Sequence, residues 1–309
     1  MKVSIVMLVY NHEKFIRQAL ESILIQKVSF DYELIVGEDC STDQSRTIIK
    51  EYEQKFNGRM KAIYRSKNVG TFQNLMDCFR NCKGKYVAFL EGDDYWSDEH
   101  KLQKTVEFLE ENTQYSAVAH NYRIVDLSNK FIRYGLELDG IYEFDKKKLE
   151  KFKLPSQTST LLIRNIISQI KKEDLIIILK YKWIPLDRIA AIVLLRFGKI
   201  AVLPDIMSTY RYYIEATGTN WTSKYDIAAK ENYFFFYKLM CGMEKLSAEM
   251  KIPLDMMTAK VELLRKAIKA RRWSNHKIRL YFQYINMILL ERHKIRLMKA
   301  IIKSLTTSR

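Results

Sequence analysis

The first half of the chain alternates short apolar runs with segments of helical periodicity, and this alternation restricts the possible folds more than any other feature. Four apolar runs predict strands at residues 3–10, 32–36, 60–64 and 86–90. Apolar spacing and capping residues predict helices after them, at residues 13–26, 41–56, 71–82 and 98–111. Because each strand is followed by a helix, we expect an α/β fold with a mainly parallel twisted sheet and helices on both faces.

The second half is less regular. Strands are predicted at residues 117–125, 161–164 and 200–203, and a helix at residues 186–197. From about residue 225 onward only helical periodicity is visible, which predicts a helical appendage.

Polar side chains follow three of the predicted strands. They are Asn11 after the first strand, Glu38 and Asp39 after the second, and Glu91, Asp93 and Asp94 after the fourth. Ligands of parallel α/β sheets bind outside the carboxyl ends of the strands, so these groups are expected at one ligand-binding edge. Three neighbouring carboxylates repel one another unless a cation lies among them, and their hard oxygen atoms suit Mg²⁺ or Mn²⁺.

The sequence lacks both glycine-rich phosphate-binding motifs, G-x-G-x-x-G after the first strand and G-x-x-x-x-G-K-[ST] anywhere. A dinucleotide-dependent dehydrogenase or a P-loop enzyme would need one of them. A metal held by Asp93 and Asp94 could neutralise a substrate diphosphate instead.

Four stretches, in order, resemble the nucleotide-sugar half of family-2 glycosyltransferases of the bacterial surface-glycan type, which are inverting enzymes with the GT-A fold. They are VSIVMLVYNHEKFIRQALESIL, ELIVGEDCSTD, KNVGTFQN and YVAFLEGDDYW. The stretch WIPLDRIAAIVLLRFGKIAVLPDIMSTYR resembles the acceptor segment of the same family. The resemblance implies a catalytic domain over residues 1–222, with a nucleotide-sugar half (1–125) and an acceptor half (126–222), followed by a basic helical region (223–309).

The resemblance also implies site residues. Those expected to bind the nucleotide-sugar are Val9, Tyr10, Asn11, Glu38, Asp39, Asn68, Gly70, Glu91, Asp93 and Arg211. Val9 and Tyr10 would form the base pocket, and Asp39 would accept a hydrogen bond from the imide of uracil. Asp94, with Asp93, would bind Mn²⁺ or Mg²⁺, and Asp187 would be the catalytic base that deprotonates the acceptor hydroxyl.

Several of these residues also have a structural interpretation. Asp39 can cap the following turn, and Asp187 can cap the helix that it begins, where the helix N-terminus would lower its pKa. His120 can line the acceptor pocket or pack in the core. Arg211 can clamp a phosphate or form a structural ion pair.

The positive charge lies mainly at the C-terminus. The chain has a formal net charge of +16, and residues 251–309 contain fifteen Lys or Arg against three acids, or +12. A basic amphipathic helix there can bind an anionic membrane surface. Alternatively, it packs on the catalytic domain or on a second copy of this chain. The composition also suits nucleic acid, but no nucleic-acid-binding module accompanies it, so we expect none to bind.

Together these observations predict a glycosyltransferase that moves a sugar from a nucleotide-diphosphate donor, a UDP-sugar, to a hydroxyl of a lipid-linked or growing surface glycan. Two alternatives remain, a sugar-nucleotidyltransferase and a non-catalytic nucleotide-sugar binder. Four scattered cysteines and the absence of an 18-residue uncharged apolar stretch predict a cytoplasmic protein, and the basic tail predicts peripheral binding to the inner face of the plasma membrane.

Overall fold

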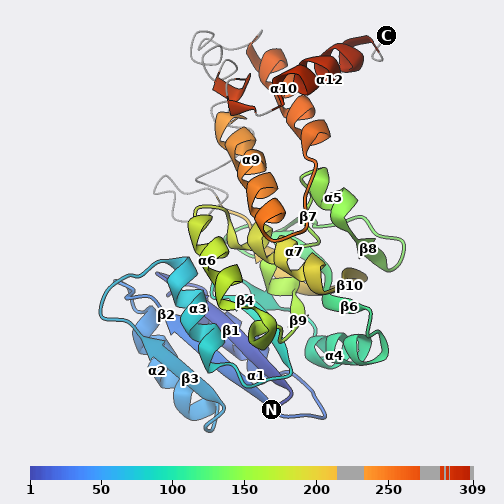
Figure 1. The fold of residues 1–309 in the computed structure, drawn as a ribbon. Helices are drawn as coiled ribbons and strands as arrows, with labels where there is room; N and C mark the ends of the chain where they lie inside the picture. The colour runs from blue at the N-terminus through green and yellow to red at the C-terminus, as the bar shows by residue number, and fades with distance from the viewer. Residues whose placement is uncertain (214–232, 272–285, 289, 292, 307–309) are drawn as a thin grey trace. The chain divides into compact units, whose positions relative to one another are not determined.

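The computed structural model describes residues 1–213, 233–271, 286–288, 290–291 and 293–306 (Figure 1). Two compact units divide the chain. Unit 1 comprises Met1–Phe144, Pro155–Lys172 and Val193–Tyr212, and unit 2 comprises Asp145–Leu154, Glu173–Ile192 and Tyr213–Arg309. These units begin and end at residues other than 222, where the domain boundary was predicted. Residue 222 itself lies outside the described residues.

The N-terminal half of unit 1 is a parallel sheet. Its strands are β1 (Val3–Val9), β2 (Tyr32–Glu38), β3 (Met60–Tyr64) and β4 (Tyr86–Glu91), in the order β3-β2-β1-β4. The helices between them are α1 (Ile16–Leu24), α2 (Ser45–Lys55) and α3 (Thr71–Asn81). The predicted strand and helix order of this half is therefore confirmed, with helices a few residues shorter than expected.

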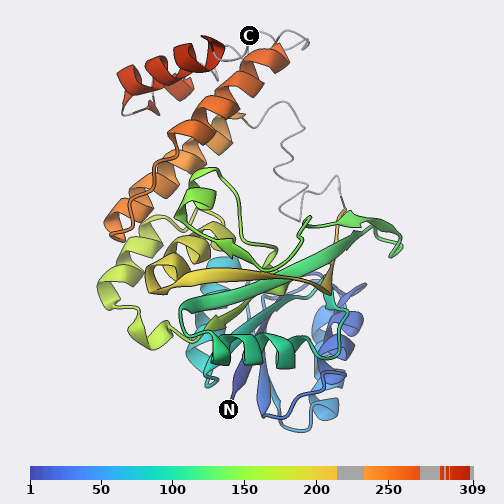
Figure 2. The same cartoon turned by 90° about the vertical axis from the view of Figure 1, so that its right-hand side faces the viewer.

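The sheet continues beyond β4 with strands of mixed direction. These are β9 (Leu162–Arg164), β6 (Tyr115–Val125), β10 (Lys199–Arg211) and β5 (Tyr95–Trp96), in the order β4-β9-β6-β10-β5. Strand β9 is antiparallel to both neighbours, whereas β6 and β10 run parallel and side by side, in green and ochre in Figure 2. Two short strands pair at the side, β7 (Phe131–Tyr134) with β6 and β8 (Tyr142–Phe144) with β10.

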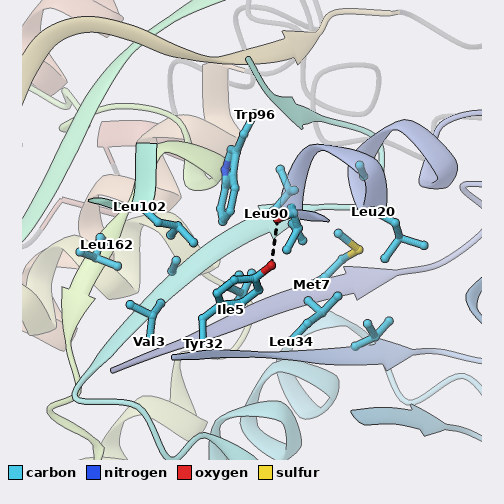
Figure 3. Close-up of a cluster of buried hydrophobic side chains, with 14 of the residues drawn as sticks. Val3, Ile5, Met7, Leu20, Tyr32, Leu34, Leu90, Trp96, Leu102 and Leu162 are labelled. Atoms are coloured by element: carbon cyan, nitrogen blue, oxygen red, sulfur yellow. Dashed lines mark hydrogen bonds between the residues drawn. The ribbon is translucent and has the colours of Figure 1, made fainter. Parts of the chain in front are cut away.

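The main core of unit 1 lies on one face of the parallel sheet (Figure 3). Val3, Ile5 and Met7 share this face because alternate residues of a strand point the same way, and all three are fully buried. They pack with Leu20 of α1 and with Leu102 of α4 (Lys101–Glu111). The apolar side chains of the strands and those on one side of the helices thus form a single hydrophobic cluster.

Helix α3 covers the opposite face and approaches the sheet closely at Gly37. The Asn74 side chain donates a hydrogen bond to the Gly37 carbonyl at 2.8 Å. A Cβ on Gly37 would lie 2.5 Å from Asn74 Oδ1 and 2.7 Å from Cys78 Sγ. A side chain on this residue would collide with α3, so glycine allows the close packing of the helix on β2.

Unit 2 is helical. Its described helices are α5 (Lys146–Glu150), most of α6 (Lys172–Lys180), the first half of α7 (Leu186–Phe197), α9 (Tyr233–Glu249), α10 (Met257–Arg271) and α12 (Lys294–Thr306). The bounds predicted for α7 are confirmed. Among the described residues, no helix combines the length and apolar character that crossing a membrane requires.

A buried ion-pair network ties the C-terminal segment into unit 2. Lys260, 1% exposed, lies 2.6 Å from Glu244 and 2.7 Å from Glu291. The Tyr237 hydroxyl donates to Glu291 at 2.8 Å. Residues of the C-terminal segment therefore pack on one another around Lys260, while Trp273, Tyr281 and Phe282 lie outside the described residues. Packing of this segment on the catalytic domain or on a second copy stays a prediction.

Candidate active site

The predicted polar clusters meet at the carboxyl edge of the parallel sheet in unit 1. The strand register pairs Val9 with Glu38 and Leu8 with Glu91, so β1, β2 and β4 end at the same level. The polar groups that follow these strands therefore lie at one edge of the sheet, as expected. Ligands of parallel α/β sheets bind at this edge.

Glu91, Asp93 and Asp94 form a compact carboxylate cluster. One oxygen atom from each lies within 4.8 Å of the others, close enough for all three to surround a single ion. Only hard oxygen donors are present in this group, and no Cys or His belongs to it. These donors fit Mg²⁺ or Mn²⁺ better than a soft transition metal.

The two aspartates of this cluster differ in environment. Asp94 is fully buried, whereas Asp93 and Glu91 are partly exposed. One Asp94 oxygen accepts hydrogen bonds from the Gln157 side chain at 2.7 Å and the Ser159 hydroxyl at 2.9 Å. Burial and the neighbouring Asp93 carboxylate raise the pKa of Asp94 well above that of an ordinary aspartate, although these hydrogen bonds act in the opposite direction.

Gln157 and Ser159 were not predicted as site residues. They belong to the segment around the short 3₁₀ helix Thr158–Thr160, which leads into β9. Ser159 also receives, at its carbonyl, the indole N–H of the buried Trp96 at 2.9 Å. The only sequence signal was a polar run, QTST, directly before an apolar strand.

Arg211, at the end of β10, is 2% exposed and connects β10 to the carboxylate cluster through hydrogen bonds. Its backbone N–H donates to the second Asp94 oxygen at 3.0 Å. Its guanidinium donates to the Asp93 carbonyl, to Gln18 and, at 3.2 Å, to Asn129.

The Arg211 guanidinium also lies over two rings, 4.8 Å from the Phe15 centroid and 4.9 Å from that of Tyr95. Two aromatic rings thus lie close to this buried side chain. This environment favours the structural interpretation of Arg211 over a phosphate clamp.

The two acids at the end of β2, Glu38 and Asp39, accept hydrogen bonds from neighbouring segments. Asp39 accepts hydrogen bonds from the backbone amides of Val69 at 2.8 Å and Gly70 at 2.9 Å, so it anchors the loop before α3. Glu38 is fully buried and accepts from Arg46 Nε at 2.6 Å. Each oxygen of Asp39 can accept a second hydrogen bond, so its predicted contact with a base is compatible with these bonds.

The other predicted nucleotide-binding residues border Asp39. The Val9 carbonyl accepts from the Asp39 amide at 3.0 Å, and Tyr10 beside it is 42% exposed. Asn11 has a left-handed φ of 59° and its side chain accepts from the Thr42 amide at 2.8 Å. In the loop before α3, the Asn68 side chain accepts from Gly70, whose φ of 82° suits glycine.

Asp187, the predicted base, lies in the first turn of α7 and in unit 2. Its side chain accepts from the Arg188 amide at 2.6 Å. Burial raises the pKa of Asp187, and the Arg188 charge offsets this only in part. The backbone amides at this helix N-terminus do lower the pKa, as expected, but the loss of hydration outweighs them and the net shift is upward.

His120 packs in the core of unit 1 and is fully buried. Its Nδ1 lies 2.8 Å from the Asn121 carbonyl, and burial lowers the pKa of His120 to about 3, so the ring is neutral. The core interpretation therefore describes it. Within the described part of the chain, neither its Nε2 nor Nζ of the buried Lys101 has a hydrogen-bond partner.

The fold defines a class before any relative is considered. A parallel sheet with an acidic cluster at its carboxyl edge, extended by strands of mixed direction, agrees with the GT-A type of α/β fold that the sequence resemblance implies. The protein sequence matches the profile described as "Glycosyl transferase family 2" over residues 4–170, more than half of the chain. The chain belongs to this family.

Two further proteins are similar in sequence. An uncharacterized protein of Mycobacterium tuberculosis strain H37Rv is 30% identical over 230 residues, which cover 72% of this chain and 61% of that protein. The poly(ribitol-phosphate) beta-N-acetylglucosaminyltransferase TarS of Staphylococcus aureus is 32% identical over 114 residues, 36% of this chain and 19% of TarS. The chain thus spans only part of the length of these relatives.

Solved structures have the same fold. TarS residues 1–349 in complex with UDP-GlcNAc align with a TM-score of 0.58 at 16% identity, covering 99% of this chain and 92% of that one. The mannosyltransferase PcManGT of Pyrobaculum calidifontis, in complex with GDP-Man and Mn²⁺, aligns with a TM-score of 0.54 at 13% identity, covering 100% and 88%. At these identities the similarity shows the fold.

Proposed function

We propose that this protein transfers one sugar from a nucleotide-diphosphate donor, a UDP-sugar, to a hydroxyl group of a lipid-linked or growing surface glycan. The observation that carries the proposal is the convergence of Glu91, Asp93 and Asp94 at the sheet edge that also holds Asp39 and Tyr10. The structural relative TarS was solved with UDP-GlcNAc, which supports a uridine donor.

In this proposal the acids have different tasks. Asp93 and Glu91, which are partly exposed, would offer oxygens to Mn²⁺ or Mg²⁺, and a bound metal would supply positive charge beside the departing diphosphate. Asp94, buried under three hydrogen bonds, holds the loop in the required shape. That Asp94 also binds the metal directly, as the resemblance implies, stays a prediction.

Tyr10 and Val9 would border the base, and Asp39 would accept from its imide N–H. Asp93 would also approach the ribose, as the resemblance implies. Asn11, Asn68 and Gly70 shape the two loops at this edge through the hydrogen bonds described above.

Asp187 would act as general base. Its carboxylate takes the proton of the acceptor hydroxyl while the oxygen attacks the anomeric carbon. The bond from that carbon to the diphosphate breaks, and the nucleoside diphosphate leaves with the bonding electrons. Attack opposite the leaving group inverts the anomeric centre. The raised pKa of Asp187 makes it a stronger base than an ordinary aspartate.

The acceptor class rests on the relatives and on the basic C-terminus. Two relatives, TarS and an enzyme of Bacillus spizizenii, are poly(ribitol-phosphate) glycosyltransferases. On α12 the side chains of Lys294, Ile295, Met298 and Lys299 are exposed, while Leu297 is buried. A helix that presents cations and apolar groups together suits peripheral binding to an anionic membrane surface, where lipid-linked acceptors lie.

A screen of UDP-, GDP- and other nucleotide-sugars tests the proposal. Mn²⁺-dependent thermal stabilisation by one donor, followed by Mn²⁺-dependent hydrolysis of that donor, is the expected result. Asp93→Asn should lose both responses. Stabilisation without hydrolysis or transfer would favour the nucleotide-sugar binder. Formation of a nucleotide-sugar and pyrophosphate from a nucleoside triphosphate and a sugar phosphate would favour the nucleotidyltransferase.

A further inference from the structure

The hairpin formed by β6 and β7 carries exposed apolar side chains that the proposed chemistry does not use. All four residues of β7 are exposed, among them Phe131 at 50%, Ile132 at 47% and Tyr134 at 54%. Leu127, in the turn, is 49% exposed. Soluble domains rarely expose several large apolar groups together unless they bind something. The hairpin is the green ribbon at the right of Figure 2.

The register of the hairpin distributes these groups. Phe131 pairs with Val125 and Tyr134 with Arg123, which places the two aromatic rings on one face, with centroids 4.9 Å apart. Arg133 pairs with Ile124 on the other face, and an irregularity in the pairing leaves Ile132 between them. Apolar groups therefore lie along the strand and at its turn instead of forming one flat surface.

The turn is held by hydrogen bonds within itself. The Asp126 side chain accepts from the amides of Ser128 at 2.8 Å and Lys130 at 2.9 Å. The Asp126 amide donates to the Lys130 carbonyl at 3.0 Å, and Asn129 has a left-handed φ of 61°. The turn's acidic side chain is thus bound within the turn, while Lys130 is exposed.

The turn is also connected to the carboxylate cluster. Asn129 accepts a hydrogen bond from the Arg211 guanidinium, which donates at the same time to the Asp93 carbonyl. A surface that holds the hairpin would therefore hold the Asp93 loop at a defined position relative to it.

We propose that the β6–β7 hairpin inserts Leu127, Phe131, Ile132 and Tyr134 into the interfacial region of a phospholipid bilayer. Apolar groups spread around a ribbon, with Lys130 and Arg133 beside them, fit a fluid layer that can surround the ribbon and accept cations at the headgroups. A protein partner with one flat binding face would cover fewer of these groups. That this insertion brings the site to a lipid-linked acceptor rests on the proposed function; the membrane contact itself does not.

Vesicle sedimentation of the full-length protein tests the proposal. In phosphatidylcholine vesicles at high salt, where attraction of the basic tail is screened, the wild type should still bind. The triple variant Phe131→Ser, Ile132→Ser, Tyr134→Ser should bind more weakly by about tenfold at least. A tenfold loss corresponds to only about 1.4 kcal/mol of lost apolar burial. The matched control is Ile176→Ser with Leu179→Ser, whose side chains are equally exposed, at 50% each, on α6.

A second variant keeps the test independent of folding defects. Ile132→Trp should show more fluorescence quenching by brominated lipids than the wild type, whose own tryptophans include Trp273 in the basic C-terminal segment. Equal vesicle binding by the triple variant and its control, or no quenching at residue 132, overturns the proposal. Loss of self-association in the triple variant with unchanged vesicle binding would assign the hairpin to a second copy of this chain. A selective rise in KM for a soluble glycan acceptor, with vesicle binding unchanged, would assign it to the acceptor glycan. Loss of donor hydrolysis alone would bear only on the proposed function.

Discussion

At the carboxyl end of β4, two adjacent aspartates have different physical environments. Asp94 is fully buried and accepts three hydrogen bonds, whereas Asp93 is partly exposed and its carbonyl is held by Arg211. The side chain of a buried carboxylate with several donors organises a loop, and a more accessible one is better placed for a ligand.

Substitution by asparagine should separate these tasks. Asp93→Asn should keep the thermal stability of the wild type and lose Mn²⁺-dependent UDP binding, because an amide is a weaker ligand for a hard cation. Asp94→Asn should lose the same binding and also about 1–3 kcal/mol of stability, because an amide cannot accept from all three donors. Calorimetric titration with UDP, with and without Mn²⁺, and urea unfolding measure both. Unchanged stability of Asp94→Asn would contradict the anchoring role, and undiminished UDP affinity in both variants would contradict the metal site.

Asp187→Asn should keep donor and metal binding and lower the rate of transfer by about 10²–10⁴-fold, the contribution of a general base. The rate of the wild type should rise with pH as Asp187 ionises. Because burial raises its pKa, this limb should lie at higher pH than for an ordinary aspartate. Steady-state kinetics across pH measure the limb, and the exposed Asp205→Asn is the control. Near-normal turnover would leave Asp187 as a helix cap, and simultaneous loss of donor binding would make it structural.

At the level of helices and strands, α4 carries an unusual buried cation. Lys101 is fully buried, with Nζ 4.0 Å from the centre of the Trp96 ring. Burial lowers its pKa to about 7, although the ring face favours the charged form and acts against this shift. Above pH 7 the unfolded chain therefore binds a proton at Lys101 that the folded protein does not.

Since the unfolded state binds more protons, the free energy of unfolding should rise from pH 7 to pH 8.5 and fall again as the pH drops towards 7. Lys101→Met, of similar shape, should remove this rise and equal or exceed the wild-type stability at pH 7. Urea unfolding at several pH values measures it. The window ends near the ordinary pKa of a thiol, because Cys78 and the half-buried Cys82 have pKa values raised to about 12 and their ionisation in the unfolded chain lowers the stability at higher pH. An identical slope in both proteins would mean that Lys101 is not the titrating group.

The sequence predicted those elements whose signals are local. Strands β1 to β4 are apolar runs between capped helices, so periodicity was enough. Strands β5 and β8 have two and three residues, and β7 is exposed throughout, so no apolar alternation marks them. The prediction of β10 ended early because Pro204 and Asp205 interrupt the apolar run, where the structure has bulges.

The candidate site shows the same limit. Its acids could be found because they lie at the ends of apolar strands, and the resemblance to the family assigned a role to each. The partners that bury Asp94 could not, because Gln157 lies 63 positions away and Arg211 117 positions away in the sequence. Tertiary contacts of this kind decide which carboxylate is accessible, and no local pattern records them.

For the molecule as a whole, the C-terminal segment combines packing with an exposed basic face. Deletion from residue 273 onward would remove Glu291 and leave the buried Lys260 with one carboxylate partner fewer, so a truncated chain would be destabilised for reasons unrelated to membranes. Charge removal on α12 is a cleaner change, because Lys294 and Lys299 are exposed.

Lys294→Gln with Lys299→Gln should weaken binding to phosphatidylglycerol vesicles at low salt by about tenfold or more, since each cation near an anionic surface contributes about 1 kcal/mol. Binding to phosphatidylcholine vesicles at high salt should not change. The control Lys61→Gln with Lys83→Gln removes the same charge from exposed positions in unit 1. If both pairs have equal effects, the attraction reflects net charge alone; if neither has any, α12 does not contact the membrane.

The Arg211 link also decides what counts as a minimal functional piece of this gene product. The segment matched to the family profile ends at residue 170. However, the backbone N–H that donates to Asp94 and the guanidinium that donates to the Asp93 carbonyl both belong to Arg211. During synthesis, therefore, the acidic loop emerges early but stays incomplete until β10 has left the ribosome and paired with β6. A fragment cut at the border of sequence similarity would contain every acid of the donor site, with Gln157 and Ser159, but would lack the Arg211 contacts to Asp94 and Asp93.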